Sequence, residues 1–296
     1  MAYLGCDDLK MIDSKPETKL CTLTVKDSIV TITIKREEVY NALNEKLIYE
    51  LIQLLSWSKN HSVGENNNLI DSNGDKNLRI LILKSEGKHF CAGADINMMR
   101  EAGSKSVEQN RKDSIQLDQL FHSLWSHPCF TIGVIQGVAL GGGAGLVSCL
   151  DYAIMESNSK IALSEAKLGI LPAVIGPYVY RRIGSAQFRR LSMMAGRIDA
   201  KEALRIGFVD EIVSDSNDFM ESIDKIILEI LSTGPMAISE AKKLTLFFDF
   251  WTGDNLQLRQ FTLDKTSEMR GSKEGQEGLS SFIERRNPDW KDEKQG

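Results

Sequence analysis

The strongest constraint on the fold of this chain is an almost uncharged stretch that runs from Ser123 to Leu150. Apart from two cysteines, its only ionisable side chain is His127, and its length approaches that of a membrane span. Pro128, Gln136 and the glycine run 141–143 divide it into shorter pieces. We therefore expect a buried strand, a glycine turn and the start of a helix here, and no helix that crosses a bilayer.

The rest of the chain alternates between strand and helix patterns. Two β-branched segments, 22–26 and 29–34, predict a hairpin, and Asn44 is placed to cap a helix that runs from Glu45 to about Ser58. Further strands are expected at 78–83, 130–135, 152–155 and 160–162, one helix before Trp125 with Ile115, Leu117, Leu120 and Leu124 facing inward, and mainly helices after Pro177. Strands that alternate with helices predict an α/β fold with a mostly buried sheet.

These patterns divide the chain of 296 residues into three parts. Residues 1–20 are expected to be a flexible leader, 21–205 a core that carries the active site, and 206–296 a mainly helical C-terminal region. The segment 61–77 is rich in Asn, Gly and Ser, so we expect a solvated loop there.

Composition excludes several classes of protein. A formal net charge of −5 argues against a broad basic face, so no nucleic acid partner is expected. The five cysteines are scattered without a CxxC pair, which indicates neither a disulfide framework nor a metal site. The first 19 residues lack an apolar run long enough for a secretory signal. A reducing compartment, and hence a cytoplasmic location, is the expectation.

The glycine run in the segment ALGGGAGL (139–146) is the first candidate for chemistry. Its spacing differs from that of a dinucleotide-binding fingerprint, which needs GxGxxG. Glycines before an apolar helix allow close backbone approach and leave free N–H groups, which could stabilise an oxyanion. Close packing between the strand and the helix explains the same pattern, and the two interpretations stay open at this point.

Two further segments have candidate roles. Phe90–Asp95 follows a strand and places small residues beside a glycine, as expected where a ligand lies against the main chain or where the chain simply turns. No evident base lies near Cys91, so we interpret it as a small buried side chain. Glu165 is a lone carboxylate between apolar runs. Burial would raise its pKa and suit it to proton transfer, while an exposed acid or an ion pair with Lys167 are the alternatives.

The order of these motifs resembles the crotonase (enoyl-CoA hydratase/isomerase) superfamily. The resemblance extends from about Leu20 to Trp290. Each motif is weak alone, but their order and spacing are specific. The motifs are Tyr40–Asn44, Phe90–Asp95, Gly141–Gly143, Glu165, and Glu277-Gly278 followed by Phe282–Arg286.

The resemblance implies a spiral of ββα units with a helical C-terminal region that mediates trimers, often paired into hexamers. It implies an acyl-CoA substrate and no separate cofactor, because coenzyme A is part of the substrate. The N–H groups of Ala94 and Gly142 would bind the thioester oxygen, with Glu165 as the general acid/base. Contacts to the CoA thioester would come from Ala92, Gly93, Asp95, Gly141 and Gly145.

One departure from the hydratase pattern affects the expected reaction. The usual first acid lies two residues after the glycine triplet, where this chain has Gly145. The run 162–180 resembles the methylglutaconyl-CoA hydratase-like branch of leucine and isoprenoid breakdown. Hydration of a methylglutaconyl-CoA-like or other branched enoyl-CoA is therefore the leading prediction. The alternatives are a Δ-isomerase that uses a single Glu, a decarboxylase or dehydratase of polyketide β-branching, and an inactive acyl-CoA-binding homologue.

Overall fold

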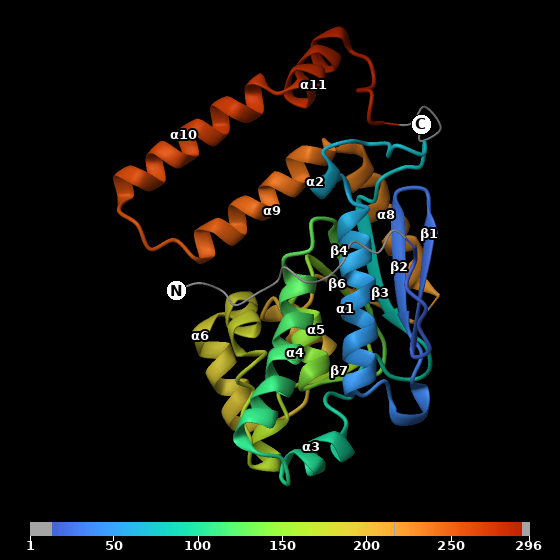
Figure 1. The fold of residues 1–296 in the computed structure, drawn as a ribbon, viewed down its shortest axis with the longest axis vertical. Helices are drawn as coiled ribbons and strands as arrows, with labels where there is room; N and C mark the ends of the chain where they lie inside the picture. The colour runs from blue at the N-terminus through green and yellow to red at the C-terminus, as the bar shows by residue number, and fades with distance from the viewer. Residues whose placement is uncertain (1–13, 216, 292–296) are drawn as a thin grey trace.

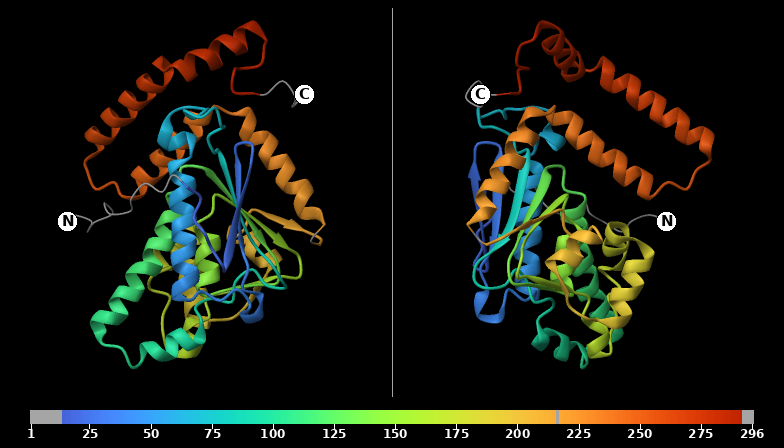
Figure 2. Two further views of the ribbon diagram at one scale, coloured as in Figure 1. Left: turned by 45° about the vertical axis from the view of Figure 1, so that its right-hand side comes forward. Right: turned by 180° about the vertical axis from the view of Figure 1, so that it is seen from behind.

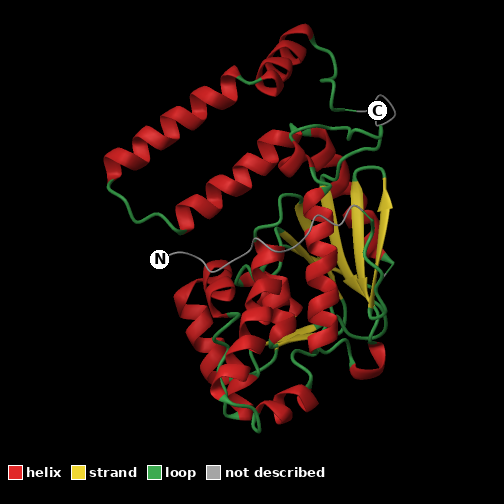
Figure 3. Ribbon diagram, viewed as in Figure 1, coloured by secondary structure: helices red, strands yellow, loops and turns green. Residues whose placement is uncertain are grey.

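The computed structural model describes residues 14–215 and 217–291 and is built around one six-stranded sheet (Figures 1 and 3). The strand order is β1-β2-β3-β4-β6-β9, and only the β1–β2 hairpin is antiparallel. The strands are β1 (Cys21–Lys26), β2 (Ile29–Ile34), β3 (Ile80–Ser85), β4 (Phe130–Ile135), β6 (Tyr152–Glu156) and β9 (Glu211–Val213). The predicted hairpin and the strand at 130–135 are confirmed.

Alternating side chains of the sheet point into two hydrophobic layers. In β3, Leu81 and Leu83 belong to the larger core, which α1 (Glu45–Asn60), α4 (Val107–Trp125) and α5 (Gly142–Ser148) cover. Ile80 and Ile82 belong to a smaller cluster beneath α8 (Asp218–Ser232). Figure 2 shows α8 on the side of the sheet opposite to α1. Parallel strands with both faces covered are buried on both sides, which explains why apolar residues predominate in them, as in the run ILIL at the start of β3.

A second, three-stranded sheet forms part of the expected spiral of ββα units. It is formed by β5 (Val138–Leu140), β7 (Lys160–Ala162) and β8 (Ile198–Asp199), in that order. α6 (Gly176–Met194) and α7 (Ala200–Arg205) flank it, and Gly184 interrupts α6 with a φ of 74°. The predicted α/β class with ββα units is confirmed.

The helix expected before Trp125 is two helices, α3 (Ile96–Ala102) and α4. The Ser106 side chain accepts a hydrogen bond from the Gln109 N–H at 3.2 Å, and the Gln109 side chain accepts one from the Ser106 N–H at 2.9 Å. This capping box starts α4 as a separate helix. The prediction that Ile115 faces inward was wrong, because that side chain is 54% exposed.

The polar segment 61–77 is exposed over most of its length, as predicted for a solvated loop, but its first residues are packed. It contains a short helix, α2 (Val63–Asn66), in which Val63 and Gly64 are buried. A Cβ on Gly64 would lie 2.2 Å from Ser239 Oγ of α9 (Pro235–Asp249), so the two helices are in close contact. Gly64 allows this close packing because it has no side chain. A glycine gives no hydrophobic signal in a sequence, so the contact was not predicted.

The two ends of the described chain add to the core and extend beyond it. Residues 1–13 of the predicted leader lie outside the described residues. The last two residues of the leader are attached to the core, because the N–H groups of Lys19 and Leu20 donate to the buried Glu50 carboxylate at 3.0 and 2.7 Å. β9 adds a strand to the main sheet beyond residue 205. α10 (Asn255–Gly271) and α11 (Lys273–Glu284) project away from the sheet (Figures 1 and 2). Within 14–215 and 217–291, no helix has both the length and the apolar character to cross a membrane.

Candidate active site

The segment Phe90–Asp95 is an extended loop held between β5 and the residues before α1. The Asp95 N–H donates to the Leu43 carbonyl at 2.8 Å, and the Leu43 N–H donates to the Gly93 carbonyl at 2.7 Å. The amide of Ala94 lies between these two hydrogen bonds and takes part in neither. Within the described residues, the Ala94 N–H therefore donates to no acceptor.

The glycine run connects β5 to α5. The Gly141 N–H donates to the Ala162 carbonyl at 2.9 Å, and Gly141 has a φ of 49° and a ψ of −114°, a conformation that glycine tolerates best. Gly142 is the first residue of α5, so its N–H has no acceptor inside the helix. It donates to none elsewhere in the part of the chain that the structure describes.

These two free N–H groups lie close together. A Cβ on Gly142 would be 3.8 Å from the Ala94 nitrogen, and a Cβ on Gly93 would be 3.6 Å from the Gly142 nitrogen. Gly93 has a φ of 97°, and its Cβ would lie only 2.8 Å from the Leu140 carbonyl oxygen. Glycine is needed for this approach, because a side chain at 93 would collide with the main chain. Two free donors this close can bind one developing oxyanion.

Glu165 is adjacent to the same turn. It begins the short 3₁₀ helix η2 (Glu165–Leu168), and its Oε1 would be 3.1 Å from a Cβ on Gly141. Oε2 is buried without a hydrogen-bond partner. Burial raises the pKa of Glu165 above its ordinary value. No ion pair joins it to Lys167 within the described residues, so the carboxyl is available to exchange a proton.

A cavity of about 390 Å³ connects these groups. Ala94, Gly142 and Glu165, the three residues predicted to be catalytic, all line it. Apolar side chains of α3 and of the segment 170–175 form much of the remaining wall, and α4 contributes mainly polar residues. The other predicted contact residues are not among those that line the cavity, and their roles stay predictions: Ala92, Gly93, Asp95, Gly141 and Gly145.

The position of the missing first acid is filled by other side chains. Gly145 is buried in α5, and a Cβ there would lie 2.4 Å from Ile175 Cγ2 and 3.0 Å from Phe121 Cε1. A carboxylate side chain at 145 would therefore require Ile175 to move. Among the described residues that line the cavity, Glu165 is the carboxylate next to the Gly141 turn, and its role as the single general acid/base stays a prediction.

Two polar residues that sequence analysis did not identify fix the Phe90–Asp95 loop. Arg36 forms an ion pair with Asp95 at 2.7 Å, and both side chains are largely buried. Asp95 Oδ1 also accepts from the Asn97 N–H at 2.9 Å, which caps α3. The buried Asn41 side chain donates to the carbonyls of Glu86 and His89 at 2.8 and 2.7 Å. The only sequence signal for this role is the motif that contains Asn41.

A second polar cluster, also not identified from the sequence, borders the cavity. Lys105 lies between two carboxylates, with Nζ 2.7 Å from Asp113 Oδ2 and 2.9 Å from Glu45 Oε1. Asp113 and Glu45 both line the cavity. This cluster connects the start of α1, the loop before α4, and α4 itself, three segments that are distant in sequence.

Cys91 has no nucleophilic role in this arrangement. Its side chain is fully buried, and burial raises the pKa of its thiol to about 12. A thiol with that pKa remains protonated at neutral pH. The prediction of a small buried side chain is confirmed.

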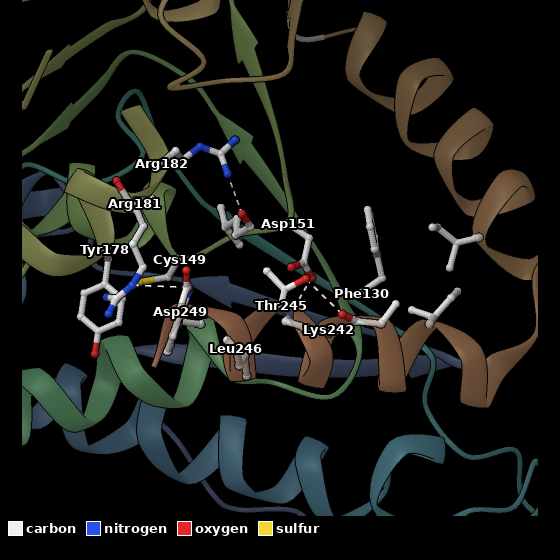
Figure 4. Close-up of a pocket in the computed structure, with 16 residues that line it drawn as sticks. Phe130, Cys149, Asp151, Tyr178, Arg181, Arg182, Lys242, Thr245, Leu246 and Asp249 are labelled. Carbon is white, nitrogen blue, oxygen red and sulfur yellow. Dashed lines mark hydrogen bonds and ion pairs between the residues drawn. The ribbon is translucent and has the colours of Figure 1, made fainter. Parts of the chain in front are cut away.

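A larger cavity, of about 560 Å³, lies between α9 and the core (Figure 4). Its charged side chains pair with one another: Arg181 Nε is 3.4 Å from Asp249 Oδ2, and Lys242 Nζ is 2.7 Å from Asp151 Oδ2. The Arg181 guanidinium also lies over the Trp125 ring, 5.0 Å from its centroid. None of the predicted site residues lines this cavity, so the candidate site is the one at Glu165.

Comparison with known proteins agrees with this geometry. The enoyl-CoA hydratase/isomerase family profile matches residues 24–294. The structure superposes on an enoyl-CoA hydratase from Shewanella pealeana with a TM-score of 0.83 and 34% identity, over 93% of this chain and 97% of that one. An enoyl-CoA hydratase/isomerase from Marinobacter aquaeolei gives 0.81 and 28%, over 92% and 99%.

A curated relative supports the same assignment. The short-chain-enoyl-CoA hydratase of Clostridium acetobutylicum is 31% identical over 75% of this chain and 78% of its own length. The chain therefore belongs to the enoyl-CoA hydratase/isomerase family of the crotonase superfamily, and it is an enzyme of that family, a hydro-lyase or isomerase that acts on an acyl-CoA.

Proposed function

We propose that this enzyme adds water to the double bond of an enoyl-CoA through an enolate held by the N–H groups of Ala94 and Gly142. The observation that carries the proposal is the buried, unpartnered Glu165 Oε2 in the cavity that these two donors line. A thioester carbonyl at the donors would place the adjacent carbons near Glu165. Removing one such donor typically lowers a rate by about 10² to 10³.

One carboxylate can carry the proton through the whole reaction. Ionised Glu165 accepts a proton from water as the water oxygen bonds to the β-carbon, and the π electrons move to the thioester oxygen. The enolate is stabilised by the two N–H groups. Glu165 then donates the same proton to the α-carbon, so the net change is addition of one water. Burial favours this cycle, because a raised pKa makes the neutral acid easier to form.

Isomerisation is the second candidate, and the packing at Gly145 favours it. Ile175 and Phe121 occupy the space of a second carboxylate that would help to orient water. In isomerisation, Glu165 removes a proton from the α-carbon of a 3-enoyl-CoA and returns it to the γ-carbon. This reaction needs the same oxyanion donors and no ordered water.

For the acyl group we propose a branched enoyl chain. The sequence resemblance implies either a methylglutaconyl-like chain, which ends in a carboxylate, or another branched chain. The mainly apolar side chains that line the cavity support a branched, uncharged chain. The carboxylated substrate stays a prediction and belongs in the test below.

A turnover screen distinguishes these functions. We expect loss of the conjugated enoyl absorbance and formation of a 3-hydroxyacyl-CoA from crotonyl-CoA or a branched 2-enoyl-CoA. Formation of a conjugated product from a 3-enoyl-CoA would instead identify an isomerase. 3-Methylglutaconyl-CoA tests the carboxylated alternative. Calorimetric binding of these thioesters without turnover of any of them would contradict the proposal and favour the inactive acyl-CoA-binding homologue.

We also propose that the chain assembles as a homotrimer or as a dimer of trimers. α10 contains no buried residue, and Phe282 and Ile283 of α11 are 84% and 78% exposed. Such an exposed apolar surface is typical of a protein–protein contact. Sedimentation equilibrium should give three or six times the chain mass of 33.1 kDa. The mass of a single chain would contradict this proposal.

Four cysteines of the described chain, Cys21, Cys91, Cys129 and Cys149, are buried free thiols. Free thiols are typical of a reducing compartment, and we propose a cytoplasmic location on that basis.

A further inference from the structure

We propose that the cavity at Glu165 discriminates against acyl groups that end in a carboxylate, with Asp113 as a specificity-determining residue. This inference rests on the proposed function, which places the thioester carbonyl at Ala94 and Gly142 and directs the acyl chain into the cavity. It goes further by naming the class of acyl group and a side chain that selects it.

The charged residues that line the cavity are all acidic. The described residues that line it include three carboxylates, Glu45, Asp113 and Glu165, and no Lys, Arg or His. The remainder of the wall is mainly apolar, with the side chains of Leu43, Ile48, Met98, Met99, Leu117, Ile170 and Leu171 among others. Three neutral polar side chains, Asn110, Ser114 and Gln116, also line the cavity. A carboxylate on the substrate would meet like charge in a mainly apolar wall, and no cation among the described lining residues would pair with it.

Lys105 bridges two of the lining carboxylates. Lys105 contacts Asp113 at 2.7 Å and Glu45 at 2.9 Å, and it is not among the lining residues. While Glu165 is ionised, the three lining carboxylates and Lys105 together carry a net negative charge. To reach Lys105, a substrate carboxylate would have to displace one of its two partners.

The size of the discrimination follows from Coulomb's law. Two like charges about 6 Å apart, in the effective dielectric of a partly exposed protein site, change an equilibrium constant by roughly tenfold to a hundredfold. This repulsion can weaken the binding of an anionic acyl chain without any steric block.

The test uses saturated thioesters of matched shape, so that binding is measured without turnover. Glutaryl-CoA ends in a carboxylate, and 5-methylhexanoyl-CoA replaces its two carboxylate oxygens with methyl groups. We expect calorimetry to show at least a roughly tenfold lower Kd for the uncharged thioester. Equal Kd values, or tighter binding of glutaryl-CoA, would overturn the inference.

The variant Asp113→Asn assigns the effect to a residue. It removes a cavity carboxylate and releases Lys105 from one partner, so the ratio of the two Kd values should fall severalfold, mainly through tighter glutaryl-CoA binding. Glu108→Gln is the matched control, because Glu108 lies on the same helix with 82% of its side chain exposed. The control should keep the wild-type ratio. A ratio that is unchanged in Asp113→Asn would overturn the role of Asp113.

Two additions keep the test decisive. If Asp113→Asn does not fold, Glu45→Gln removes a cavity charge from the other side of Lys105 and should lower the ratio in the same direction. γ-Butyrobetainyl-CoA, compared with 5,5-dimethylhexanoyl-CoA, tests the sign of the effect. The cationic chain should bind at least as tightly as its neutral counterpart, and much weaker binding of the cation would overturn the electrostatic basis of the inference.

The turnover screen tests the proposed function, and the ratio of Kd values tests the inference. A preserved preference for the uncharged thioester without turnover contradicts only the proposed function. Turnover with equal Kd values contradicts only the inference. The absence of binding by either saturated thioester contradicts both.

Discussion

Replacing Glu165 with Gln should lower the kcat for the best enoyl-CoA substrate by about 10²- to 10⁴-fold, the usual contribution of a general acid/base. Gln keeps the size and polarity of the side chain but cannot accept and return a proton. KM should change much less, because the proposed donors to the thioester oxygen, the Ala94 and Gly142 N–H groups, are the same in both proteins. Steady-state kinetics measures both parameters.

The pH dependence of the wild-type enzyme provides a second readout of the same residue. Burial raises the pKa of Glu165, and the ionised form starts the hydration cycle. kcat/KM should therefore fall toward acid pH with a midpoint above the pKa of an ordinary glutamate. Glu229→Gln makes the same chemical change on an exposed position of α8 and should leave the kinetics unchanged. Wild-type kcat in Glu165→Gln would rule out Glu165 as the proton carrier.

Replacing Gly142 with Ala should lower kcat by about 10²-fold or more, comparable to losing an oxyanion donor. The added methyl group would lie 3.8 Å from the Ala94 nitrogen and 3.0 Å from Leu43 Cδ1. It would therefore crowd the space beside the Ala94 N–H, where we propose that the thioester oxygen binds. The fold should be retained, because Leu43 Cδ1 is the end of a flexible side chain.

Gly196→Ala is the matched control for this change, because a Cβ at 196 meets no atom within 4 Å. Stopped-flow or steady-state assays on crotonyl-CoA, together with thermal melting of each variant, separate a loss of catalysis from a loss of stability. If Gly142→Ala is as active as Gly196→Ala, the space beside the Gly142 N–H does not hold the reacting oxygen.

The elements predicted correctly from the sequence are those whose signals are local. The strand Phe130–Ile135 is a continuous apolar run bounded by Pro128 and Gln136, and its limits agree with β4. Asn44 accepts a hydrogen bond from the Leu47 N–H at 2.9 Å, as expected for the cap of α1. Periodicity, caps and glycine runs act within a few residues, so one sequence is enough to locate them.

The features that sequence analysis did not find depend on contacts between distant segments. Ile175 fills the space beside Gly145, and nothing near either residue in the sequence indicates that they meet. The same is true of the Lys105 cluster, in which Glu45 and Asp113 come from different helices. Charged residues on helices usually face solvent, so their place at a cavity requires the three-dimensional structure.

The most direct test of an enolate mechanism is exchange of the α-protons of a saturated thioester in deuterium oxide. Butyryl-CoA has no double bond to hydrate, so deuterium can enter its α-carbon only if the enzyme forms and reprotonates the enolate. We predict deuterium uptake, followed by mass spectrometry, with the wild-type enzyme and Glu229→Gln, and loss of uptake in Glu165→Gln. No uptake with the wild-type enzyme, or undiminished uptake in Glu165→Gln, would contradict the enolate mechanism with Glu165 as its base.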